Sequence, residues 1–81
     1  MTLNQIIEKL KMENAQSMEK HGKWKGMPTA AQNIAIFNEM IEWDEAQERG
    51  DIHGEHGEIT EAIHVMNVMA RRIMYLTGED Q

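Results

Sequence analysis

Three glycines within eight residues, at positions 50, 54 and 57, interrupt two long segments with helical periodicity. In the segment before them, apolar side chains recur every three or four positions from Ala30 to Trp43. In the segment after them, a second apolar stripe runs from Ile59 to Leu76. Two helices of similar length joined by a short turn form an antiparallel pair. The sequence therefore predicts a helical hairpin, with helices over residues 30–49 and 58–76.

A third amphipathic segment, residues 3–20, precedes this hairpin. Thr2 and Gln5 have the spacing of a capping box at its start, and Thr29 and Gln32 repeat that spacing at the start of the next helix. We therefore expect a single all-α domain of three helices that occupies the whole chain.

The small size of the chain limits its hydrophobic core. A protein of 81 residues buries only about 60–65% of the surface that its unfolded form exposes. The apolar faces of the hairpin are broad, so we expect a second copy to complete a four-helix core, in a homodimer or a tetramer. The chain has no cysteine, which excludes disulfides and thiolate metal sites. It has neither a signal-peptide pattern nor an apolar run of about 18 residues, so we expect a cytoplasmic protein without membrane contact.

Acidic residues are concentrated in the hairpin. Nine of the 14 acidic residues and three of the four histidines lie between positions 39 and 64, where Arg49 is the only base. This stretch contains two Glu-x-x-Glu pairs, Glu39/Glu42 and Glu58/Glu61. Residues three apart share a helix face, so each pair directs two carboxylates the same way. Like charges at this spacing destabilise a helix unless a cation or a proton separates them.

The antiparallel hairpin places the two acidic pairs near each other, close to the turn. Helical bundles hold metal ions with carboxylates from facing helices, and oxygen ligands suit a hard divalent cation. The alternative is a solvated acidic face. His53 and His56 are either transition-metal ligands or part of a surface turn. His64 borders the apolar stripe and is either a metal ligand or a histidine hydrogen-bonded at the edge of the core.

The loop between the first two helices carries Trp24 between two lysines, Lys23 and Lys25. One interpretation is a hinge whose tryptophan folds back onto the core. The other is an aromatic platform with cationic neighbours, which suits a nucleobase and its phosphates. The net charge of −6 argues against a nucleic-acid binder, which normally has a basic face. Small phosphorylated ligands remain compatible with it, because a bound metal reverses the local charge.

Three segments carry a family resemblance: EKHGKW (Glu19–Trp24), NEMIEWDEA (Asn38–Ala46) and GEITEAIHVMNVMARRI (Gly57–Ile73). They resemble the all-α nucleotide pyrophosphohydrolases of the MazG-like superfamily, which includes short phage-encoded members. In that family, Glu-x-x-Glu on one helix and Glu-x-x-Asp on the next hold Mg²⁺ ions that bind the phosphates of a nucleoside triphosphate. The resemblance implies that this chain hydrolyses an NTP or dNTP to the monophosphate and pyrophosphate.

The resemblance assigns Glu39 and Glu42 to the first motif, and one of the two would act as the catalytic base. The second motif fits in two registers. It is either Glu58 and Glu61, or Glu61 and His64, with the histidine in place of the family's aspartate. The cofactor that the resemblance implies is Mg²⁺. Mn²⁺ is the alternative, because imidazole suits Mn²⁺ or Zn²⁺ better than Mg²⁺. The residues that would contact the base or the phosphates are Lys23, Trp24, Lys25, Asn67 and Arg71.

Three classes of function stay open at this point. The first is the metal-dependent pyrophosphohydrolase, which we favour. The second is a relative that binds a nucleotide without cleaving it, as the loss of the fourth acid at His64 suggests. The third is a small acidic phage-type inhibitor that occupies a basic site on a partner protein. The first two require the acidic pairs to converge, whereas the third requires an exposed acidic face.

Overall fold

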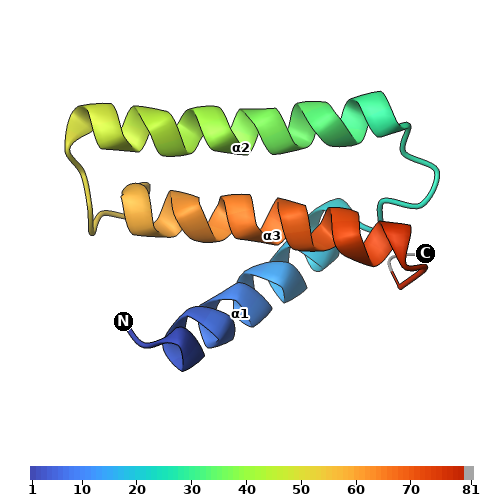
Figure 1. Cartoon of the computed structure of the whole chain (residues 1–81), viewed down its shortest axis with the longest axis horizontal. Coiled ribbons are helices and arrows are strands. Elements are labelled where there is room, and N and C mark those ends of the chain that lie inside the picture. The colour runs from blue at the N-terminus through green and yellow to red at the C-terminus, as the bar shows by residue number, and fades with distance from the viewer. Residues whose placement is uncertain (80–81) are drawn as a thin grey trace.

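The computed structural model describes residues 1–79, which form three α-helices and no strand: α1 (Leu3–His21), α2 (Thr29–Arg49) and α3 (Glu58–Leu76) (Figure 1). The predicted all-α class is confirmed, and each helix lies within one residue of its predicted bounds. The antiparallel packing of α2 against α3 is also confirmed (Figure 1). No helix in the described part of the chain is long and apolar enough to cross a membrane.

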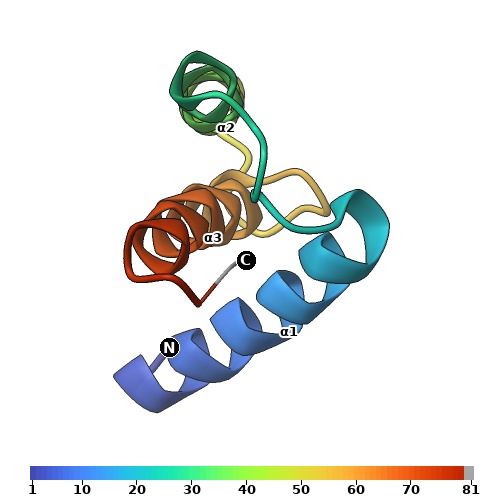
Figure 2. The ribbon, with the colours of Figure 1, turned by 90° about the vertical axis from the view of Figure 1, so that its right-hand side faces the viewer.

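The helix α3 lies at the centre of the molecule. It packs against α2 on one side and against α1 on another, and α1 crosses it obliquely (Figures 1 and 2). Within residues 1–79, no Cα atom of α1 lies within 8 Å of one in α2. The two outer helices, α1 and α2, therefore diverge from each other and leave space between them on one side of α3.

The helix starts show one capping prediction confirmed and one wrong. At α1, Thr2 and Gln5 form the reciprocal capping box, with bonds of 3.2 and 2.8 Å. At α2, the residue before the helix is Pro28, and no side chain caps the helix. Gln32 is instead buried and donates its side-chain amide to the carbonyl of Met27 at 2.9 Å. The side chain of Gln32 thus bonds to the preceding loop instead of capping the helix. Sequence spacing alone does not distinguish these two partners.

The turn between α2 and α3 is closed by close backbone contacts. Gly50 ends α2 with a φ of 68°, a left-handed conformation that glycine adopts without strain. Asp51 then accepts a bond from the amide of Gly54 at 2.9 Å, and its carbonyl accepts one from Glu58 at 2.7 Å. A Cβ atom on Gly57 would lie 2.8 Å from the backbone nitrogen of Gly54. These contacts hold the start of α3 against the turn that follows α2.

The buried interior of a single chain is small and largely polar. Among residues 1–79, the buried apolar residues are Trp24, Ala46 and Ile63, and the buried polar ones are Gln32, Glu61, Asn67 and Arg71. The apolar stripes of the hairpin instead face outward. Exposure is 55–60% for Ile34, Phe37 and Ile41 of α2, and 40–58% for Met66, Met69 and Ile73 of α3. The four-helix core of a dimer thus stays a prediction.

Candidate metal centre

The divergent helices enclose a groove of about 1130 Å³, with α3 as its floor. Glu39 and Glu42 of α2 line one side, and Glu13 of α1 lines the opposite side. The floor is a polar stripe of α3, formed by residues three or four positions apart. Its members are Glu61, His64, Asn67 and Arg71. The groove therefore brings polar side chains from all three helices together.

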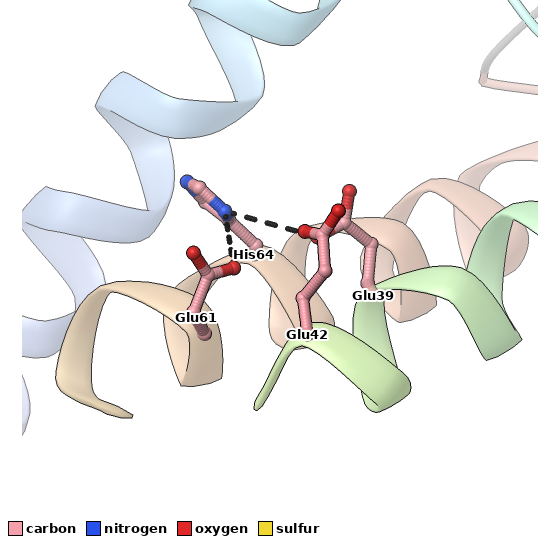
Figure 3. Close-up of side chains that lie close together, drawn as sticks. All are labelled: Glu39, Glu42, Glu61 and His64. Atoms are coloured by element: carbon pink, nitrogen blue, oxygen red, sulfur yellow. Dashed lines mark hydrogen bonds and ion pairs between the residues drawn. The ribbon is translucent and has the colours of Figure 1, made fainter. Parts of the chain in front are cut away.

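Four side chains in this groove could hold a metal ion. One ligand atom from each of Glu39, Glu42, Glu61 and His64 lies within 4.8 Å of the others, and Figure 3 shows the four side chains pointing toward one another. Oxygen ligands at about 2.1–2.5 Å from one cation lie up to about 4–5 Å apart. The spacing within the cluster therefore matches the ligands of a single divalent ion.

Burial and a neighbouring carboxylate raise the proton affinity of Glu39. The pKa of Glu39 is raised from 4.5 to about 7, first by burial and then by the negative charge of Glu42. The Oε2 atom of Glu39 is buried and has no hydrogen-bond partner among the described residues. A buried carboxylate oxygen without a partner is costly, and a bound cation would satisfy it.

Histidines are the direct partners of Glu61, whose side chain is only 4% exposed. The Oε2 atom of Glu61 lies 3.1 Å from Nδ1 of His64, and its Oε1 atom lies 3.4 Å from Nδ1 of His56. The Nδ1 atom of His64 also lies 3.7 Å from Oε2 of Glu39 (Figure 3). The imidazole of His64 is thus placed between acids of both hairpin helices.

Glu58, the first residue of the second Glu-x-x-Glu pair, lies outside this cluster. Its carboxylate accepts a hydrogen bond from the side chain of Gln47 at 3.0 Å. Of the two registers left open by the sequence, the side chains that converge with Glu39 and Glu42 are those of Glu61 and His64. The exposed His53 lies in the turn, outside the cluster, and is not among the residues that line the groove.

The tryptophan of the first loop folds back onto the molecule, as one of the two interpretations expected. Trp24 is 4% exposed, and the guanidinium of Arg71 lies 5.4 Å from its ring centroid. The lysines on either side of it, Lys23 and Lys25, are exposed. Trp24 lines the groove, whereas these two lysines do not.

Asn67 and Arg71 attach α1 to α3. Asn67 accepts a hydrogen bond from Asn14 at 3.0 Å. Arg71 donates to the hydroxyl of Ser17 at 3.0 Å and to the carbonyl of Gly22. Both side chains are therefore engaged with α1 and its C-terminal end, while they also line the groove.

Sequence reasoning missed one acidic neighbour of the cluster. Glu13 of α1 places its Oε2 atom 3.5 Å from Nε2 of His64. No spacing motif connects these residues, which are 51 positions apart, because their proximity depends on how α1 crosses α3.

Comparison with known proteins identifies no relative of this chain. No known protein family, curated protein or solved structure matches the chain.

Proposed function

We propose that the protein is a metal-dependent nucleotide pyrophosphohydrolase that converts an NTP or dNTP to the monophosphate and pyrophosphate. The observation that supports this most is the convergence of three carboxylates and an imidazole from α2 and α3, with a buried oxygen on Glu39 that lacks a hydrogen-bond partner among the described residues. The groove of about 1130 Å³ is slightly larger than the usual range for small-molecule sites, about 300–1,000 Å³. It has room for a nucleotide beside the ion.

The proposed chemistry follows from the charge of a divalent cation. The expected ion is Mg²⁺ from the family resemblance, with Mn²⁺ as the alternative. It would neutralise phosphate oxygens and lower the pKa of a bound water. Glu42 or Glu39 would accept the proton of that water as it attacks the α-phosphorus. The bond from that phosphorus to the bridging oxygen would break, and pyrophosphate would leave with the electron pair.

Cationic groups at the α1 end of the groove support a phosphorylated ligand. Lys20 and His21 line it there, together with Arg71. Lys23 and Lys25 belong to the adjacent loop and are proposed to contact the ligand only from outside the groove. Trp24 already carries Arg71 against its ring, so base stacking there requires the guanidinium to move. We therefore place the phosphates, rather than the base, near this end.

A non-catalytic nucleotide-binding protein is the second candidate. The observation that favours it is His64 at the position where a fourth carboxylate would complete an all-oxygen site. The acidic inhibitor is less favoured, because Glu61 is buried and Glu39 is partly buried inside a groove. An inhibitor that mimics an acidic surface needs such groups exposed to a partner.

We also propose that the protein self-associates into a homodimer or tetramer. The exposed apolar stripes of α2 and α3 support this proposal, as does the scarcity of buried apolar residues in residues 1–79. Chains of this size with so small a core gain stability by association. A second hairpin packed on the first would cover these stripes and build a four-helix core.

The test of the enzymatic proposal is ³¹P NMR of the protein with each common NTP and dNTP, first with Mg²⁺ and then with Mn²⁺. Two variants accompany the wild type: Glu42→Ala, and Glu48→Ala as a matched control on an exposed acid of α2 outside the cluster. We expect pyrophosphate with the wild type and the control, and none with Glu42→Ala. Broadened phosphate signals without pyrophosphate would favour the non-catalytic nucleotide-binding protein over the enzyme. Unchanged spectra would contradict both nucleotide proposals.

A further inference from the structure

We propose that the cluster selects a transition-metal ion of the Mn²⁺, Co²⁺ or Zn²⁺ class over Mg²⁺, with His64 as the selecting ligand and Glu13 of α1 as the residue that orients its ring. This inference rests on the cation site of the proposed function. It adds the chemical class of the ion, and it assigns a role to a helix outside the hairpin.

The two nitrogens of His64 face different parts of the molecule. Nδ1 lies 3.1 Å from Oε2 of Glu61 and 3.7 Å from Oε2 of Glu39, on the side of the cluster. Nε2 lies 3.5 Å from Oε2 of Glu13, a residue of α1. A histidine binds a metal through an unprotonated nitrogen, while the other nitrogen carries the hydrogen. Nδ1 is therefore the coordinating atom.

Glu13 supplies the acceptor that this arrangement needs. A carboxylate beside the distal nitrogen of a ligating histidine holds the ring in one tautomer and orientation, and it increases the basicity of the coordinating nitrogen. Glu13 is partly buried and approaches Nε2 from the opposite side to the cluster. The 3.5 Å separation is long for a hydrogen bond. We expect it to shorten when coordination polarises the ring N–H group.

The ligand set determines which ions the cluster prefers. Mg²⁺ demands oxygen ligands in near-ideal octahedral geometry and releases its water reluctantly. Imidazole favours borderline transition ions, and carboxylates accept Mn²⁺ as readily as Mg²⁺. Three carboxylates with one imidazole should therefore bind Mn²⁺, Co²⁺ and Zn²⁺ more tightly than Mg²⁺. The buried oxygen of Glu39 lacks a hydrogen-bond partner among the described residues and lies 3.7 Å from Nδ1 of His64, so a cation held by both atoms would satisfy it.

The experiment uses the full chain and two ions, Mn²⁺ and Mg²⁺. Isothermal titration calorimetry measures both affinities, and electron spin-echo spectroscopy of the Mn²⁺ complex detects a directly bound ¹⁴N nucleus. We expect Mn²⁺ to bind at least about ten-fold more tightly than Mg²⁺, with a ¹⁴N coupling from His64. A His56→Ala variant should keep that coupling, which excludes the exposed histidine of the turn as its source.

Two substitutions separate selection from folding. His64→Asp should abolish the ¹⁴N coupling and bring the Mg²⁺ affinity close to that for Mn²⁺. Glu13→Gln should weaken Mn²⁺ binding by about 10–100-fold, the usual effect of losing the partner of a ligating histidine, with a smaller effect on Mg²⁺. Glu8→Gln is the matched control on α1, since this exposed glutamate pairs with Lys11 and is not among the residues that line the groove. Far-UV circular dichroism of each variant verifies that the helices form.

The outcomes distinguish this inference from the proposed function. Equal affinities for the two ions, or a Mn²⁺ complex without nitrogen coupling, would overturn the inference and leave a Mg²⁺ hydrolase intact. Absence of binding by either ion would overturn both. A Mn²⁺ preference with nitrogen coupling, in a protein that leaves every nucleotide intact, would support the inference and contradict the hydrolase.

Discussion

The Nδ1 atom of His64 lies 3.1 Å from the Oε2 atom of Glu61, one turn earlier on α3. A buried carboxylate and an imidazole on one helix face meet the Glu-x-x-Glu pair of α2 across the hairpin. Three carboxylates therefore share one imidazole within the cluster, and the ion-pair partners of Glu61 are histidines, which carry charge only when protonated. This imbalance determines how the cluster should respond to the loss of a carboxylate and to pH.

The first prediction concerns Glu61, the most deeply buried acid of the cluster. Glu61→Gln retains the shape of the side chain but removes one negative charge from the cluster. We expect cation affinity to fall by at least about ten-fold, because ligand charge largely sets the affinity of carboxylate sites. Calorimetric titration with Mn²⁺ measures the change. Glu48→Gln, at an exposed position of α2, should bind as the wild type does, and equal weakening in both variants would point to a general charge effect.

The second prediction concerns the pH dependence of stability in the cation-free protein. The pKa of Glu39 is raised from 4.5 to about 7 by burial and by Glu42. The folded state therefore holds this proton more tightly than the unfolded state, so its contribution to stability is present below pH 4.5 and is lost as the pH rises through 7. We expect Glu39→Gln to raise the melting temperature relative to the wild type at pH 8 and to have a smaller effect at pH 5.

A saturating divalent cation should reverse this pattern in the wild type alone. The cation replaces the proton on Glu39, so the wild type should gain stability at pH 8, whereas Glu39→Gln should gain little. Thermal unfolding followed by circular dichroism at both pH values measures these differences. A wild-type melting temperature that responds to pH in the same way as the variant's would show that Glu39 is not the responsible group.

The third prediction concerns the exposed apolar stripe of α2. Phe37 is 60% exposed, so replacing it with glutamate places a charge on the surface that we propose is covered by a second copy. We expect the wild type to sediment with at least twice the 9.4 kDa mass of one chain, and Phe37→Glu to shift toward the monomer. Analytical ultracentrifugation across a concentration series measures both. Asp44→Lys, on an exposed non-apolar position of the same helix, should leave the association unchanged.

The fourth prediction concerns the turn that sets the hairpin register. A Cβ atom on Gly57 would lie 2.8 Å from the nitrogen of Gly54 and 2.9 Å from the Oδ1 atom of Asp51. Gly57→Ala should therefore lower the free energy of unfolding by about 1–3 kcal/mol, as crowding in packed regions does. Urea unfolding measures this. His53→Ala, exposed in the same turn, should change it by less than about 0.5 kcal/mol.

Weakened metal binding is expected to accompany that loss of stability. Displacement of the turn would shift Glu61 and His64 relative to Glu39 and Glu42, because both pairs lie close to it in sequence. Gly57→Ala should therefore bind Mn²⁺ more weakly even at temperatures where it is fully folded. Wild-type affinity in a folded Gly57→Ala protein would show that the register does not depend on this contact.

The helices and their hairpin were predictable because their signals are local. Apolar side chains at helical spacing, the Thr2 capping box and the glycines at the helix ends identify all three elements to within one residue. The pairing of Glu39 with Glu42 is equally local, since residues three apart share a helix face wherever the helix packs. The failure at Gln32 shows the limit of such signals, because the side chain instead donates to the carbonyl of Met27 and accepts a hydrogen bond from Arg72 of α3.

What the sequence determined by itself is therefore the set of helices, their antiparallel order and the acidic face of α2. Only the tertiary structure decided that Glu61 and His64, rather than Glu58, complete the cluster, and that Glu13 approaches it from α1. The reason is geometric. One helical turn of register shift exchanges the residues that face each other across a hairpin, and that register depends on the contacts of the Asp51–Gly57 turn. The crossing of α1 over α3 has no counterpart in local spacing at all.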